Sequence, residues 1–219
     1  MALASVNLAL YIAIITGADS YVLTLSGNVQ LTMAQPWTLI SYAFTHTHFA
    51  HLAVNIFLLL WMGFIFERYY SSWLFAGAYI IGGLAGGCTF ELCYMIADAW
   101  QGQLSGASAA VLAIMSFVAI NRRHKSTIEK YIYYILIAII FINIAGLFGN
   151  NPGGSIAHLG GIAAGTIISL IVTMQRRQRT KHADNAKDPL ITKAELSGYT
   201  SLSHNEREQL FKQSKANSK

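Results

Sequence analysis

The chain has 219 residues, of which 54% are hydrophobic and only 11% are charged. A soluble domain has about a quarter of its residues charged, so this composition excludes the ordinary soluble classes and favours a membrane protein. The net charge of +5 comes from Lys and Arg residues placed beside apolar segments. It indicates membrane topology rather than nucleic-acid binding.

Six apolar segments follow one another along the chain, and a membrane-spanning helix needs about 20 such residues. They lie at about 3–24, 49–70, 72–97, 107–121, 130–148 and 155–174. The predicted fold class is therefore an all-α membrane protein, with a bundle of six transmembrane helices in a membrane domain at residues 1–174. The first segment has no basic residue before it, so we interpret it as a retained helix and not as a cleaved signal peptide.

Three other segments have distinctive lengths or compositions. The fourth apolar segment, 107–121, is short for a span, so we expect its start to lie below the membrane surface. The aromatic-rich loop at 25–48 is long for a connection without function, and we expect it to be partly embedded. The polar segment 175–219 is predicted to be a disordered cytoplasmic tail.

The positions of the basic residues predict how the chain is oriented. Short cytoplasmic loops carry an excess of Lys and Arg. Ten of the basic residues follow the sixth segment, and the other five follow the second or the fourth: Arg68, Arg122, Arg123, Lys125 and Lys130. Both termini should therefore face the cytoplasm, and the loops after the first, third and fifth segments should face outward.

Polar residues among small ones mark the outer ends of the second, fourth and sixth segments. His51 and Asn55 are four residues apart and share a helix face. Ser108 follows Gly106, and His158 shares its face with two glycines at positions 161 and 165. Small residues allow helices to approach closely, and a hydrogen bond between a serine and a histidine requires such an approach.

With these residues the chain resembles the rhomboid family of intramembrane serine proteases over about residues 30–174. The resemblance implies the family's basic form, six spans with an embedded first outer loop. It is carried by five motifs: His46, His51-Leu-x-x-Asn55, Gly63-x-x-x-Glu67, Gly106-x-Ser108 and Ala157-His158-x-x-Gly161-x-x-x-Gly165.

The resemblance implies a serine endopeptidase that works through a Ser-His dyad without a cofactor or a metal. Ser108 would be the nucleophile and His158 the general base and then the general acid. The oxyanion would be held by the side chains of His51 and Asn55 and by the backbone N–H of Ser108. Structural support would come from five further residues: His46, Glu67, Gly106, Gly161 and Gly165.

The chain departs from the family pattern near the nucleophile. Ala109 stands where many members have Gly, and Leu112 stands where some members place a Tyr against the catalytic histidine. The departure at Leu112 leaves open what orients His158.

The implied partners are single- or multi-span membrane protein substrates and the lipid bilayer, with no nucleic acid. The expected location is a bacterial inner membrane, with the active site open to the outer side. One alternative is a catalytically inactive rhomboid-like protein that binds membrane clients. Another is a metalloprotease, suggested by His46, His48, His51 and His158, although the sequence has no His-Glu-x-x-His motif.

Overall fold

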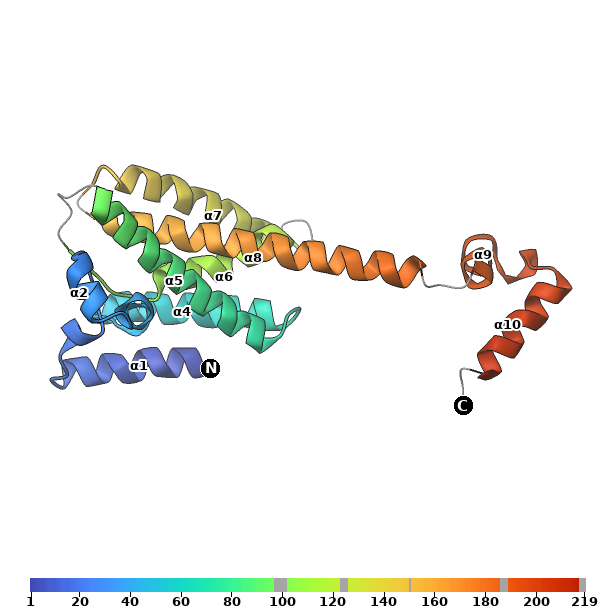
Figure 1. Cartoon of the computed structure of the whole chain (residues 1–219), viewed down its shortest axis with the longest axis horizontal. Helices are drawn as coiled ribbons and strands as arrows, with labels where there is room; N and C mark the ends of the chain where they lie inside the picture. The colour runs from blue at the N-terminus through green and yellow to red at the C-terminus, as the bar shows by residue number, and fades with distance from the viewer. Residues whose placement is uncertain (97–101, 123–125, 150, 186–188, 217–219) are drawn as a thin grey trace. The chain divides into compact units, whose positions relative to one another are not determined.

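The computed structural model describes residues 1–96, 102–122, 126–149, 151–185 and 189–216 (Figure 1). The chain divides into two compact units, Met1–Ile171 and Val172–Lys219. The first unit is built from helices: α1 (Ala2–Ile15), α4 (Phe49–Glu67), α5 (Ser72–Ile96), α6 (Ser108–Arg122), α7 (Thr127–Gly146) and the first part of α8 (Pro152–Asn185). Helix α1 lies beside α4.

Within the described residues, four helices are long and apolar enough to cross a membrane: α4, α5, α7 and α8. Together with the helical fold, this makes the protein an all-α membrane protein. Helices α1 and α6 are also apolar but have only 14 and 15 residues. Six spans therefore stay a prediction.

The first helix is shorter than the sequence predicted. It ends at Ile15, whereas the apolar segment runs to about residue 24. Gly17 has a φ of +113°, which breaks the helix, and the carboxylate of Asp19 accepts a hydrogen bond from the N–H of Tyr21 at 2.9 Å to begin a new 3-10 turn.

Helix α6 is the centre of the first unit. All eleven residues from Ala109 to Ala119 are buried. Neighbouring helices approach α6 closely because they present glycines to Ala109 and Ala113: Gly82 and Gly86 on α5, and Gly161 and Gly165 on α8. The first residue of this enclosed helix is Ser108.

The segment between α1 and α4 has structure of its own. It contains η1 (Ser20–Val22), β1 (Leu25–Ser26), α2 (Val29–Ala34), α3 (Thr38–Ser41) and η2 (Tyr42–Phe44). Strand β1 pairs antiparallel with β2 (Gln103–Leu104), which lies just before α6. This pairing joins the first loop to the loop that leads into Ser108.

The same segment is hydrogen-bonded to α5. The hydroxyl of Tyr42 donates to the carbonyl of Gly83 at 2.7 Å, and the hydroxyl of Tyr79 donates to the carbonyl of Ala43 at 2.6 Å. All four groups are buried, so these bonds hold the segment firmly against the bundle. Whether the segment is also embedded in lipid stays a prediction.

At the opposite end of the bundle, the start of α7 is tied to the end of α6. The hydroxyl of Ser126 accepts from the N–H of Glu129 at 3.2 Å, and the Glu129 carboxylate pairs with Arg122 at 3.0 Å. The Arg122 guanidinium also lies 3.5 Å from the centre of the Tyr69 ring. Four basic residues used in the orientation prediction lie outside the described residues: Arg123, Lys125, Lys187 and Lys219.

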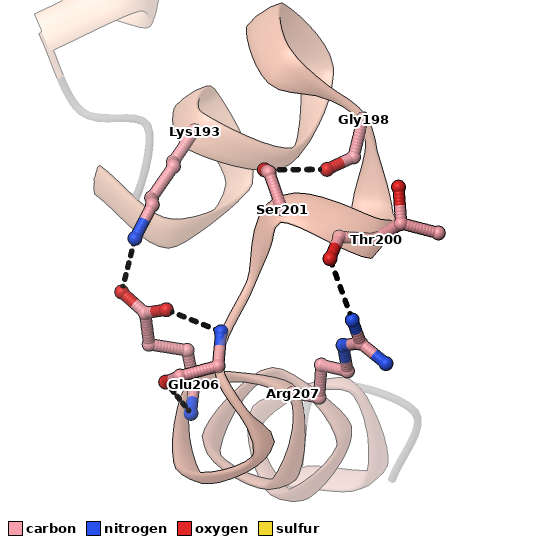
Figure 2. Close-up of polar contacts among 7 residues, drawn as sticks. Lys193, Gly198, Thr200, Ser201, Glu206 and Arg207 are labelled. Carbon is pink, nitrogen blue, oxygen red and sulfur yellow. Dashed lines mark hydrogen bonds and ion pairs between the residues drawn. The ribbon is translucent and has the colours of Figure 1, made fainter.

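The second unit contains α9 (Pro189–Ser197), η3 (Tyr199–Ser201) and α10 (His204–Ala216). Figure 2 shows the contacts of Glu206, whose carboxylate pairs with Lys193 at 2.8 Å and accepts from the N–H of Ser203 at 2.7 Å. The Lys193 hydrogen bond and those to Ser203 lower the pKa of Glu206 to about 2. Most of the described residues of this segment are helical, and the predicted disorder of 175–219 in solution stays a prediction.

Candidate active site

Ser108 follows a tight turn that the first loop holds in place. Gly106 has a φ of +115°, which favours glycine, and its N–H donates to the carbonyl of Tyr42 at 3.0 Å. Helix α6 then begins at Ser108, and its first helical hydrogen bond runs from the N–H of Val111 to the carbonyl of Ala107 at 2.9 Å. The N–H groups before Val111 therefore have no acceptor within the helix.

Ser108 and His158 are brought together from residues 50 positions apart. The Oγ of Ser108 lies 2.6 Å from Nε2 of His158, and both side chains are half-buried. His158 stands in the second turn of α8, one turn before Gly161, which lies against the backbone of Ala109. This close helix contact is what allows the hydrogen bond.

The other ring nitrogen of His158 has a partner that the sequence analysis missed. Nδ1 lies 2.8 Å from Oδ1 of Asn143, a buried residue of α7. Asn143 is the one polar side chain between Tyr134 and Gly146. Polar residues inside apolar spans are costly without a partner, so this isolated amide was the signal that could have identified it.

His46 supports the turn before Ser108. Its Nε2 accepts a hydrogen bond from the N–H of Ala107 at 3.3 Å, and its fully buried ring packs edge-on against His51, with 5.0 Å between ring centres. Burial, followed by the nearby charge of His51 when protonated, lowers the pKa of His46 to about 4. The ring is therefore neutral at pH 7 and keeps a lone pair for Ala107.

His51 and Asn55 lie on the first turns of α4. The imidazole of His51 is packed directly against Gly106, two residues before Ser108. Asn55 is buried, and its amide donates to the carbonyl of His51 at 2.8 Å. A primary amide has two N–H groups, so Asn55 keeps one further donor.

Other predicted residues lie away from this cluster or take no part in it. Glu67 is exposed at the end of α4, and its side chain has no hydrogen bond or ion pair with any other residue that the structure describes. His48 is exposed before the start of α4, and Leu112 is buried within α6. Within the described ranges, His, Cys, Asp and Glu side chains form no group of three that could hold a metal.

The fold and the site define an all-helical membrane protein in which a serine at the start of one helix is hydrogen-bonded to a histidine of its neighbour. A family model described as the rhomboid domain matches residues 33–175. That match covers more than half of the chain, and the chain belongs to the rhomboid family.

Several curated relatives are similar to the chain. Human rhomboid-related protein 3 is 26% identical over 160 residues, which are 67% of this chain and 39% of that protein. Rhomboid-like protease 1 of Toxoplasma gondii is 26% identical over 64% of this chain and 48% of its own length. Rhomboid protease GluP of Bacillus subtilis is 27% identical over 63% of this chain and 26% of its own length. The chain thus spans less than half of the length of each of these relatives.

Proposed function

We propose that this protein is an intramembrane serine endopeptidase that cleaves the transmembrane segments of other membrane proteins. The observation that carries the proposal is the 2.6 Å hydrogen bond between the Ser108 hydroxyl and Nε2 of His158. A serine is a weak nucleophile unless a base within about 2.6–3.2 Å accepts its proton. Membership of a family with relatives named as proteases supports the same function.

In the first step, Oγ of Ser108 attacks the carbonyl carbon of the scissile peptide bond while Nε2 of His158 takes the hydroxyl proton. The tetrahedral intermediate then collapses, the C–N bond breaks, and His158 returns the proton to the leaving amine. A water molecule attacks the resulting ester in the second step, with His158 again accepting and then returning a proton, and a free carboxylic acid leaves Ser108.

Three donors are proposed for the oxyanion of the intermediate. The N–H of Ser108 belongs to the first turn of α6, where the N–H groups have no acceptor within the helix and the helix dipole favours negative charge. The second N–H of the Asn55 amide and the imidazole of His51 would supply the others. Losing one such donor typically costs about 2.7–4 kcal/mol of transition-state stabilisation.

The proposal places the protein in a bacterial inner membrane with six spans, including α1 and α6. Both termini would then be cytoplasmic, and the site would open to the outer side, as the positions of the basic residues favour. Helix α6 would begin below the membrane surface, because 15 residues cover only about 22 Å of a hydrocarbon core of about 30 Å. The substrate would be a single- or multi-span membrane protein.

The test is cleavage of a single-span substrate in liposomes by the wild type, Ser108→Ala and His158→Ala. Both variants should lose the product, and a fluorophosphonate should label the wild type but not Ser108→Ala. Two variants serve as matched controls. Ser116→Ala removes a buried hydroxyl of the same helix that donates to Ile162 at 3.0 Å, and His48→Ala removes an exposed histidine. Both controls should still cleave.

Three outcomes would overturn the proposal. Equal cleavage by the wild type, Ser108→Ala and His158→Ala would refute the dyad. Binding of the substrate without any product in the wild type would favour the inactive, client-binding alternative. Loss of cleavage in EDTA without labelling of Ser108 would favour the metalloprotease instead.

A further inference from the structure

The amide of Asn143 has a defined direction in the structure. Its Nδ2 donates to the carbonyl of Ile139 at 2.8 Å, one turn earlier on α7. Because a carbonyl oxygen only accepts hydrogen bonds, Nδ2 must be the atom on this side. Oδ1 therefore faces His158, and the opposite orientation would set two oxygens against each other.

This direction determines which nitrogen of His158 carries the proton. Oδ1 of Asn143 can only accept, so Nδ1 of His158, at 2.8 Å, must be the donor. In a neutral imidazole the other nitrogen is then an acceptor, and Nε2 lies 2.6 Å from the hydroxyl of Ser108. The chain of hydrogen bonds thus runs from Ser108 through His158 and Asn143 to the backbone of α7.

The geometry points to Asn143 as the positioning residue that holds His158 in the Nδ1–H tautomer, with Nε2 free to act as the base toward Ser108. The inference rests on the proposed function and supplies the support for His158 that Leu112, an aliphatic side chain, cannot supply by hydrogen bonding. An amide carries no net charge, so Asn143 orients the ring and takes no proton from it. Its bond to His158 strengthens when the ring becomes an imidazolium, because a charged donor makes a stronger hydrogen bond.

Asn143→Leu tests this role, since leucine has a similar size and no acceptor. We expect kcat to fall about 10- to 100-fold with KM nearly unchanged, because a lost hydrogen bond of about 1.4 kcal/mol or more costs tenfold or more in rate. The labelling of Ser108 by a fluorophosphonate should slow in parallel. Asn143→Asp keeps an oxygen at the accepting position and should recover most of the lost rate.

A spectroscopic measurement reads the tautomer directly. The full chain, labelled with ¹⁵N in its 7 histidines, should show Nδ1 of His158 protonated in the wild type, with the signal assigned by its loss in His158→Ala. Asn143→Leu should lose this preference. Asn121→Leu is the matched control, because Asn121 also donates to the carbonyl one turn earlier, that of Phe117, at 3.2 Å. In Asn121→Leu, the tautomer of His158 and the kcat should equal those of the wild type.

Unchanged kcat and an unchanged tautomer in Asn143→Leu would overturn the inference. A lower kcat with lower thermal stability and an unchanged tautomer would overturn it as well, since Asn143 would then be merely structural. Failure of the proposed function is a separate result, namely full activity of Ser108→Ala. The nitrogen spectrum needs no turnover and decides the role of Asn143 even in that case.

Discussion

The imidazole of His51 occupies the space that a side chain at Gly106 would need. A Cβ at position 106 would lie 2.8 Å from Nε2 of His51, a separation that Cβ atoms essentially never show. Gly106 also has a φ of +115°, which L residues rarely adopt. One glycine therefore allows both the turn before Ser108 and the packing of His51 beside it.

Gly106→Ala should lower both stability and activity. The unfavourable φ alone costs of order 1–3 kcal/mol, and the displacement of His51 adds to this. We expect a lower thermal midpoint in detergent and a strong loss of substrate cleavage.

Two other glycines separate the effect of the unfavourable φ from the effect of displacing His51. Gly17 has a φ of +113° but nothing within 4 Å of a Cβ there, and Gly77 has neither feature. Gly17→Ala should lose stability and keep its cleavage rate, and Gly77→Ala should keep both. If Gly106→Ala cleaved substrate as well as Gly17→Ala does, the contact with His51 would be unimportant.

Gly161→Ala should affect catalysis more than stability. Its Cβ would meet the carbonyl group of Ala109 and come within 3.0 Å of its Cα, and backbone atoms cannot rotate away as a side chain can. Helix α8 would have to move outward and carry His158 away from Ser108. A misplacement of about 1 Å can cost about 100-fold in rate, which single-turnover cleavage would measure. Ala163→Val, at an exposed position of α8, should cleave normally, and equal rates for both variants would contradict this prediction.

The bond between Thr32 and Glu91 should stabilise the first loop. The hydroxyl of Thr32 on α2 donates to the carboxyl group of Glu91 on α5, and both residues are buried. A double-mutant cycle of Thr32→Val and Glu91→Leu should give a coupling energy of about 1 kcal/mol or more in the free energy of unfolding. Thr32→Ser keeps the hydroxyl and should retain most of the coupling. Strictly additive effects would show that the bond adds no stability.

The neutral state of His46 should make stability depend on pH. The pKa of His46 is about 4 in the folded protein, below the usual value of 6.5. As the pH falls, His46 therefore binds a proton in the unfolded chain before it does so in the folded protein. The contribution of neutral His46 to the free energy of unfolding is complete above pH 6.5 and is lost as the pH falls toward 4. The thermal midpoint of the wild type should therefore fall as the pH is lowered from 6.5 to 4. His46→Gln keeps an acceptor for Ala107 without titrating, and its profile should be flatter; parallel profiles would contradict the prediction.

Much of the site could be predicted from sequence because its residues belong to short local patterns. Ser108 beside Gly106, and His158 one turn before Gly161, each mark a place where two helices can approach, and the structure brings this serine and histidine within 2.6 Å. The end of the first helix was predicted less well, because the apolar composition continues past Gly17, where the backbone turns.

The sequence by itself determined that this is a helical membrane protein and which residues are candidates for chemistry. The physical reason is that lipid offers no hydrogen bonds, so apolar segments must form helices and polar residues within them need partners. Only the tertiary structure decided which partners those are. Asn143 meets His158 because α7 packs beside α8, and His46 meets Ala107 because the first loop folds back on the turn before α6. Such contacts depend on how whole helices pack, and no local spacing along the chain encodes them.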